Sequence, residues 1–379
     1  MFHDQPTPFL AVDKSVMTAN SLRMARFAAA RGVKLRPHAK THKSWEIARL
    51  QLLHGAVGLT VATVSEAESF ARGGFLDIFI AYPLWVDAAK AARIAALLST
   101  TTQLTLGVDS SEGATRLGEA LREINLSSEL QDRLRVRVEV DSGHHRSGLI
   151  PERSGDVALA AQRAGLTVDG VFTFPGHGYG LDRTRERAAQ DEARALTLAR
   201  DSLLTSGVNC KVVSGGSTPT ASLVNPEQSS LDPVINEMRP GVYVFNDAQQ
   251  WEMGSCQPDQ IALTVAATVV SKRGQNVIVD AGSKILGADK APWASGYGRV
   301  LDFPDARITA LSEHHATIEV ASEEEANNPA FALGTRLRLV PNHVCNTVNL
   351  VDHFFTFSSA SDAPSLEERW HVNARGANT

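Results

Sequence analysis

The first two thirds of the chain alternate short apolar runs with longer segments in which apolar residues recur every three or four positions. Short apolar runs are typical of buried strands, and the longer period is typical of amphipathic helices. Their alternation predicts a parallel sheet with helical crossovers, and about eight such strands fit a closed (β/α)₈ barrel of the TIM type. The expected strands are residues 9–13, 33–36, 59–62, 77–81, 103–109, 134–140, 168–174, 210–214 and 237–245, and the expected helices are 15–31, 45–53, 65–72, 85–98, 111–122, 156–163 and 183–204.

The pattern changes after Phe245, where helical periodicity fades and turn residues become more frequent. Period-two apolar runs dominate the remainder, which predicts a second, mostly β domain. We therefore expect an α/β barrel over residues 8–250 and a β domain over residues 251–379. The strands expected in the second domain are residues 260–270, 276–280, 315–319, 335–341 and 354–357.

Composition narrows the class of protein. The net charge of −5 provides no basic field that would attract nucleic acid. No run is apolar and long enough to span a membrane, and the polar N-terminus lacks a signal-peptide pattern. Three cysteines are too few for a disulfide framework, so we expect a cytoplasmic protein. We also expect a small-molecule substrate and neither a nucleic acid nor a membrane partner.

The stretch from Leu35 to Lys43 carries the first candidate chemistry. Pro37 biases Arg36 toward extended geometry, so a strand is expected to end there. Lys40 follows that end, which is where a barrel of this type places its chemistry. A desolvated lysine can form an imine with a carbonyl compound, whereas the alternative is a basic surface loop.

Two later stretches are candidates for binding an anion. Residues 215–220 (GGSTPT) follow a predicted strand, and such a turn can offer backbone N–H groups and hydroxyls to a phosphate. The alternative is a tight turn rich in small residues. Gly241 and Tyr243 lie in another expected strand and could add contacts, or could be ordinary barrel residues. The predicted phosphate ligands are Gly215, Gly216, Ser217, Thr218, Gly241 and Tyr243.

Two further loops follow predicted strands. Arg146, in the sequence HHRSG, could donate a fork of hydrogen bonds to an oxyanion, while the histidines before it could be surface residues. His177 and Tyr179 lie in a glycine-rich loop and are candidates for ring stacking or acid–base catalysis. A flexible loop with incidental aromatic residues is the alternative there.

His343 and Cys345 close a strand expected in the second domain. In extended geometry they point to the same face, and an imidazole with a thiolate suits a zinc-like ion. Two protein ligands leave positions for water and substrate, as a catalytic metal requires. The alternative is a buried cysteine beside a core histidine.

Together these stretches resemble the fold-type III pyridoxal phosphate enzymes, in the branch that holds D-threonine aldolases and eukaryotic-type D-serine dehydratases. Residues 36–43 (RPHAKTHK) are similar to the Schiff-base motif of that branch, residues 215–220 to its phosphate-binding turn, and His343-Val344-Cys345 to its metal pair. The resemblance runs from about residue 7 to about residue 376, with the motifs in the same order.

The resemblance implies an alanine racemase-like barrel with a β domain that residues 1–7 could join, assembled as a homodimer. It implies pyridoxal 5'-phosphate on Lys40, with His38 nearby and Arg146 beside the phenolic oxygen of the cofactor. It also implies a divalent metal (Zn, Mn, Mg or Co) on His343 and Cys345. Phe174 and Pro175 stand where relatives often carry Tyr or His, so His177 or Tyr179 would take over the role of that loop.

The implied function is a lyase acting on D-3-hydroxy amino acids. Aldolases of this branch tend to carry Asp two residues after the metal histidine, whereas this chain has Cys345, as the dehydratases do. Residues 346–350 (NTVNL) look more like the aldolases, and on that context we rank D-threonine aldolase slightly ahead of a D-serine or D-threo-3-hydroxyaspartate dehydratase. An amino-acid racemase and a non-catalytic cofactor-binding protein are further alternatives, and the second domain argues against the latter.

Overall fold

The computed structural model describes residues 5–221, 234–361 and 363–379. Contacts between residues divide the chain into two compact units. Unit 1 holds the described residues up to Arg23, residues 41–50 and residues 242–375, and unit 2 holds residues 24–40, 51–241 and 376–379. Within the described residues, no helix has the length and hydropathy needed to cross a bilayer.

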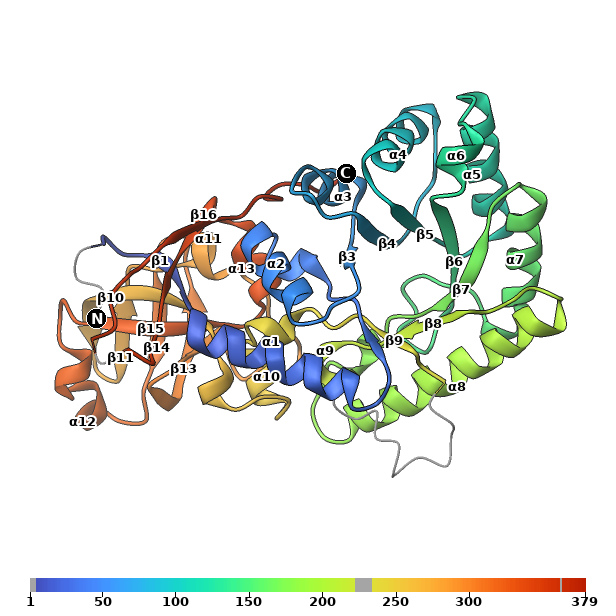
Figure 1. Ribbon diagram of the computed structural model, residues 1–379. Coiled ribbons are helices and arrows are strands. Elements are labelled where there is room, and N and C mark those ends of the chain that lie inside the picture. The colour runs from blue at the N-terminus through green and yellow to red at the C-terminus, as the bar shows by residue number, and fades with distance from the viewer. Residues whose placement is uncertain (1–4, 222–233, 362) are drawn as a thin grey trace. The chain divides into compact units, whose positions relative to one another are not determined.

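Unit 2 contains the predicted barrel of eight parallel strands, in the order β2-β9-β8-β7-β6-β5-β4-β3. An isolated parallel bridge between His38 and Thr60 joins the β2 side to β3 and closes the ring. The strands are seen at the centre of this unit in Figure 1. Their bounds are β2 Lys34–Leu35, β3 Leu59–Val61, β4 Asp77–Pro83, β5 Gln103–Val108, β6 Leu134–Glu139, β7 Val168–Phe172, β8 Val212–Gly215 and β9 Glu237–Met238.

Helices cover the outside of the barrel, as the alternating pattern predicts, and α4, α5, α7 and α8 are seen there in Figure 1. Side chains cap several of their first turns: Thr63 accepts the N–H of Glu66, and Asp87 accepts that of Lys90. The caps explain why these helices begin where they do, because each satisfies a backbone donor that the helix leaves open. The helices are α3 Val64–Arg72, α4 Ala88–Thr100, α5 Ser111–Glu123, α6 Ser128–Gln131, α7 Ser154–Arg163, α8 Thr184–Thr205 and α9 Thr218–Ala221, while α1 Lys14–Ala29 and α2 Trp45–Leu53 each contribute residues to both units.

Buried charges cross the barrel interior. The guanidinium of Arg36 bonds both oxygens of Asp77 and, through Nε, Glu237 at 2.9 Å. Arg137, which is 1% exposed, bonds Glu237 at 2.6 Å and Asp169 with a second bidentate pair. A chain of alternating charges therefore fills space that the apolar strand pattern alone would assign to aliphatic side chains.

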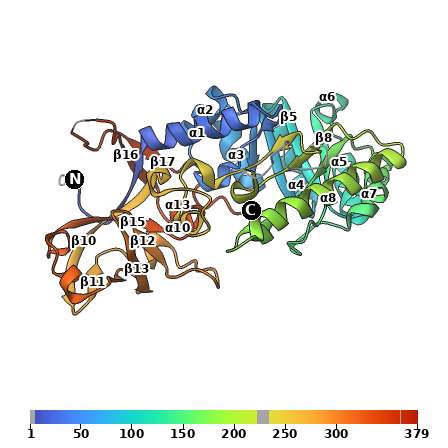
Figure 2. The same ribbon diagram turned by 90° about the horizontal axis from the view of Figure 1, so that it is seen from below.

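Unit 1 is built on a nine-stranded sheet in the order β11-β14-β13-β12-β15-β10-β1-β16-β17, in which β10 also pairs with β11 (Figure 2). The expected β character after Phe245 is observed. Its strands are β1 Phe9–Asp13, β10 Leu263–Arg273, β11 Asn276–Val279, β12 Gly298–Val300, β13 Phe303–Leu311, β14 Ala316–Glu319, β15 Arg336–Pro341, β16 His353–Phe357 and β17 Arg369–His371.

The structure differs from the expected division in the place of β1. This strand pairs antiparallel with β10 and parallel with β16, so it belongs to unit 1 and not to the barrel. The chain passes into unit 1 already at Val242, and β9 ends at Met238, before most of the expected strand over residues 237–245. The short helices of this unit are α10 Ala248–Glu252, α11 Ser283–Leu286, α12 Glu323–Ala326 and α13 Val344–Asn349.

Candidate active site

Lys40 lies within a single 3-10 turn, η1 Ala39–Thr41, shortly after β2. Its Nζ atom lies 5.7 Å from the centre of the Phe174 ring, on the loop that follows β7. The guanidinium of Arg146 lies 5.0 Å from the same ring. Three loops at the carboxyl ends of β2, β6 and β7 therefore bring a primary amine, a guanidinium and an aromatic face together.

The loop that carries Arg146 is held by carboxylates. Asp141 Oδ1 accepts the N–H groups of Gly143 and His145, at 2.9 and 3.0 Å. Glu139, at the end of β6 and 3% exposed, accepts the hydroxyl of Ser147 at 3.0 Å. Burial raises the pKa of Glu139 to about 7, although Ser147 and Arg146 favour its charged form.

The two loop residues predicted for stacking or acid–base catalysis take different places. The ring of Tyr179 lies 6.3 Å from Phe174, so it belongs to the aromatic cluster. His177 instead has its Nε2 atom 3.5 Å from Asp191 on α8. His144, which the sequence suggests as a surface residue, is partly buried and packs edge-on against Phe174 at 5.5 Å, so it also belongs to the cluster.

The glycine-rich turn begins at the end of β8. Gly216 has a φ of +87°, a left-handed conformation that favours glycine, and turns the chain toward α9. Its N–H is accepted by Glu192 of α8 at 2.5 Å, and the same carboxylate accepts the Thr220 hydroxyl at 3.3 Å. Burial raises the pKa of Glu192 to about 7 against the opposing effect of the Gly216 N–H.

The engagement of Gly216 changes the expected phosphate ligands. Because Glu192 already accepts the N–H of Gly216, an anion at this turn would depend on the Ser217 and Thr218 side chains and on other nearby donors. Both residues are buried, at 3% and 6% exposed. Gly241 is the last residue of this part of unit 2, and Tyr243 lies in the turn η4 Val242–Val244 of unit 1.

His38 donates its N–H to the Pro240 carbonyl at 3.0 Å, which extends the pairing of β2 with β9, and its bridge with Thr60 closes the barrel. Arg239, fully buried after β9, donates to the Ser214 hydroxyl and to the Thr173 carbonyl. Burial lowers the pKa of Arg239 to about 10, and the neighbouring carboxylates oppose this effect.

His343 and Cys345 come together in unit 1, although not through strand geometry. Strand β15 ends at Pro341, His343 is the extended residue at the start of α13, and Cys345 lies in the first turn of that helix. The expectation that both residues point to one face of a strand was therefore wrong. The turn nevertheless places the thiol close enough to the imidazole to affect its pKa.

Each member of this pair has a buried polar neighbour. Asp247 Oδ2 lies 3.4 Å from His343 Nδ1, and the Thr41 hydroxyl lies 3.3 Å from Cys345 Sγ. Burial lowers the pKa of His343, but Cys345 and Asp247 outweigh this effect and raise it well above the ordinary value. In the described residues no group of three or more His, Cys, Asp or Glu is arranged to hold a metal.

The side chains present fit the two groups that the resemblance implies. Lys40 supplies the amine for pyridoxal phosphate, Arg146 a cation, and Ser217 and Thr218 hydroxyls beside a glycine turn. An imidazole with a thiol is a donor set that suits a borderline-soft divalent ion.

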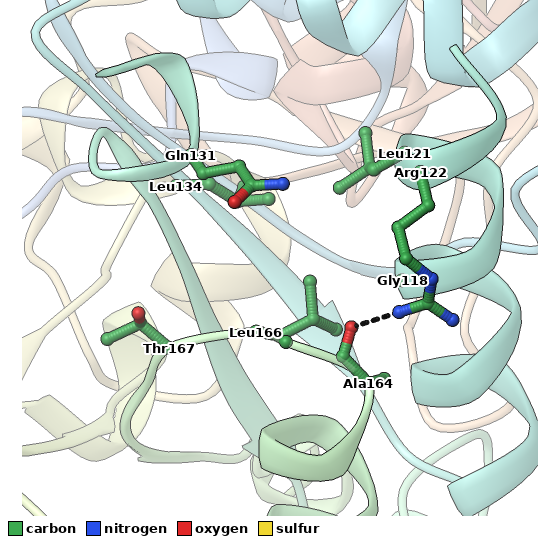
Figure 3. A pocket seen from close by; sticks show the side chains of 9 residues that line it. Gly118, Leu121, Arg122, Gln131, Leu134, Ala164, Leu166 and Thr167 are labelled. Carbon is green, nitrogen blue, oxygen red and sulfur yellow. Dashed lines mark hydrogen bonds between the residues drawn. The ribbon is translucent and has the colours of Figure 1, made fainter. Parts of the chain in front are cut away.

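A separate cavity of about 180 Å³ lies between α5 and the start of β6 and β7 (Figure 3). Leu121, Leu134 and Leu166 line it, and Arg122 donates to the Ala164 carbonyl at 2.8 Å across one side. Leu134 begins β6, so this cavity is at the amino ends of the strands, opposite the ends that carry Lys40 and Arg146.

Several polar residues of these sites were not singled out from the sequence. Glu192 and Arg239 support the glycine turn, Glu139 supports the Arg146 loop, and Asp247 contacts His343. A charged residue within a buried strand, as at Glu139, is a signal that could have been used. No local pattern distinguishes Glu192 from the other acidic residues of its long helix.

Comparisons with known proteins agree with this architecture. Residues 12–249 match the family model described as alanine racemase, N-terminal domain, and residues 262–357 match a putative serine dehydratase domain. The chain is 35% identical over 360 residues to D-threo-3-hydroxyaspartate dehydratase of Delftia sp. (strain HT23), covering 90% of this chain and 91% of that protein. It is 32% identical over 381 residues to D-threonine aldolase of Arthrobacter sp., covering 98% and 93%.

A solved structure of the Delftia dehydratase gives a TM-score of 0.85 at 31% identity and covers 97% of both chains. That structure is a cysteine-to-alanine variant in the metal-free form, and a histidine-to-alanine variant of the same enzyme has also been solved. The two substituted positions lie two residues apart, as His343 and Cys345 do. The chain belongs to the fold-type III pyridoxal phosphate enzymes, in the family that contains the D-threonine aldolases, the D-serine dehydratases and the hydroxyaspartate dehydratases.

Proposed function

We propose that this protein is a pyridoxal phosphate- and divalent metal-dependent lyase that eliminates water from a D-3-hydroxy amino acid. The dehydrated product then takes up water to give a 2-oxo acid and ammonia. The observation that carries the proposal is the pair His343 and Cys345 at the start of α13, with Asp247 beside the imidazole and Thr41 beside the thiol. The same residue types at the same spacing were substituted in the hydroxyaspartate dehydratase, whose cysteine variant is described as metal-free.

The chain's own residues have distinct roles in this proposal. When bound, pyridoxal phosphate supplies an electron sink for charge at Cα, and the metal supplies a Lewis acid for the substrate's hydroxyl. Lys40 would hold the cofactor and would move the proton at Cα of the bound substrate. Ser217 and Thr218 would hold the phosphate, Arg146 would supply a cation for the phenolic oxygen of the cofactor, and His343 and Cys345 would hold the metal.

Tyr179 and His177 have different neighbours, which suit different roles. Tyr179 lies beside Phe174, against which Lys40 and Arg146 also pack, so it is the better candidate for contact with the bound cofactor. His177 lies against Asp191 and suits a role in positioning the loop. His38, Gly241 and Tyr243 remain predicted cofactor contacts.

D-threonine aldolase is the second candidate, which the sequence context ranked first. It is favoured by residues 346–350, and these residues form most of α13, next to the metal pair. In that reaction the same hydroxyl loses its proton and the Cα–Cβ bond breaks, giving glycine and acetaldehyde. The two reactions differ in which bond to Cα breaks.

Product analysis separates the two reactions. The purified protein would be incubated with D-threo-3-hydroxyaspartate, D-serine and D-threonine, with and without chelator, and with the L-isomers as controls. A 2-oxo acid and ammonia, lost with chelator and restored by zinc, would support the dehydratase. Glycine and acetaldehyde from D-threonine would contradict it and establish the aldolase, and products that persist with chelator would contradict the metal's role in both.

A further inference from the structure

Asp247 is fully buried and makes three contacts that join two segments of unit 1. Its Oδ1 atom accepts the N–H of Gln250 at 2.9 Å and so caps α10. Its Oδ2 atom accepts the N–H of Val344 at 3.3 Å and lies 3.4 Å from His343 Nδ1. One carboxylate therefore holds both the backbone and the ring at the start of α13.

The segment around Asp247 has an unusual backbone. Asn246, just before it, has a φ of +55°, which is uncommon for a residue other than glycine. Two hydrogen bonds hold Asn246 in this conformation. Its backbone N–H donates to the Val242 carbonyl at 2.7 Å, and its side-chain amide donates to the Gln260 carbonyl at 2.9 Å. Asp247 follows this turn at the start of α10, and its carboxylate also reaches His343.

We infer that Asp247 is a positioning residue for the metal: it orients the His343 ring and fixes its tautomer, so that Nε2 is the atom presented to the ion. A carboxylate on Nδ1 keeps the proton on that nitrogen and leaves the lone pair on Nε2. The inference rests on the proposed function, because it takes His343 as a metal ligand. Nothing in the sequence motif around His343 points to Asp247, which lies 96 residues earlier in the chain.

Zinc affinity tests this inference on the whole protein. Asp247→Ser keeps a side-chain oxygen that can cap α10 but is too short to reach the imidazole. We expect its dissociation constant for Zn²⁺, measured by competition with a chromophoric chelator, to rise about 10- to 100-fold. Asp87→Ser is the matched control, since Asp87 also caps a helix, α4, and it should leave the zinc affinity unchanged.

A double-mutant cycle separates positioning from general destabilisation. In a His343→Ala background, Asp247→Ser should cause little further loss of zinc affinity, because there is no imidazole left to orient. An equal fold-loss in both backgrounds, or an unchanged affinity of the single variant, would overturn the inference. If Asp247→Ser does not fold, Asp247→Asn provides the same comparison. The oxygen of its amide can still cap α10, whereas its amide nitrogen cannot accept hydrogen bonds from Val344 and His343.

The outcomes also distinguish this inference from the proposed function. If the unsubstituted protein binds no zinc and shows no metal-dependent activity, the proposed function fails. If it binds zinc and His343→Ala weakens that binding, while Asp247→Ser does not, only the role of Asp247 is wrong.

Discussion

The buried carboxyl of Glu192 leads to a prediction about pH. Burial raises its pKa from 4.5 to about 7, and its Oε1 atom accepts the N–H of Gly216. Because the pKa is higher in the folded protein, a bound proton stabilises the fold. This contribution is complete below the unfolded value of 4.5 and is lost as the pH rises through about 7.

The size of this stabilisation follows from the rise in the pKa of Glu192. About 2.5 pKa units, at about 1.36 kcal/mol each, correspond to about 3 kcal/mol in total. Between about pH 5.5 and about pH 8.5 the fold loses about 2 kcal/mol of this stabilisation, because the remainder is already lost below about pH 5.5. Glu192→Gln removes the titration and keeps an amide oxygen for Gly216, so its free energy of unfolding, relative to the unsubstituted protein, should rise by about 2 kcal/mol across the window.

Urea unfolding at several pH values, followed by circular dichroism, would measure this difference. Glu139 titrates in both proteins and therefore cancels from the comparison. Glu119→Gln is the control, because its side chain is 47% exposed on α5, and its difference should stay nearly flat with pH. A constant difference between Glu192→Gln and the unsubstituted protein would refute the reasoning, as would one that falls with rising pH.

Three further substitutions test the sites and the barrel. Lys40→Ala should abolish the visible absorbance of lysine-linked pyridoxal phosphate, and a retained band would move the attachment to another residue. Cys345→Ala should lower bound zinc and product formation together, whereas an unchanged zinc content would make Cys345 a core residue. Arg137→Met should cost about 3–5 kcal/mol in urea unfolding, because Asp169 and Glu237 lose their shared cation, and a loss below about 1 kcal/mol would contradict the importance of that pairing.

Local patterns in the sequence were sufficient to predict the barrel and the β character of the second domain. The period of apolar residues is a property of each element by itself, so helices such as α2 and α5 follow directly from it. Lys40, Arg146 and Gly216 could be identified because parallel strands place the loops after them at one end of a barrel. The family resemblance then gave these residues their expected roles.

Other features depended on tertiary structure. The sequence of β1 resembles that of a barrel strand, but β1 pairs with β10 and β16 in unit 1. The sequence of a strand does not by itself specify which strands it pairs with. His343 and Cys345 were expected on a strand, yet the chain turns into α13 after Pro341, where Asp247 accepts the N–H of Val344.

The supporting carboxylates show the same limit most clearly. Nothing in the sequence distinguishes Glu192 and Asp247 from other acidic residues. The role of each depends on a partner that folding brings close, which is Gly216 for Glu192 and His343 for Asp247. The sequence by itself determined which residue types are available and which elements carry them. Only the tertiary structure decided which charges are buried together, because desolvation and pairing depend on neighbours that are distant along the chain.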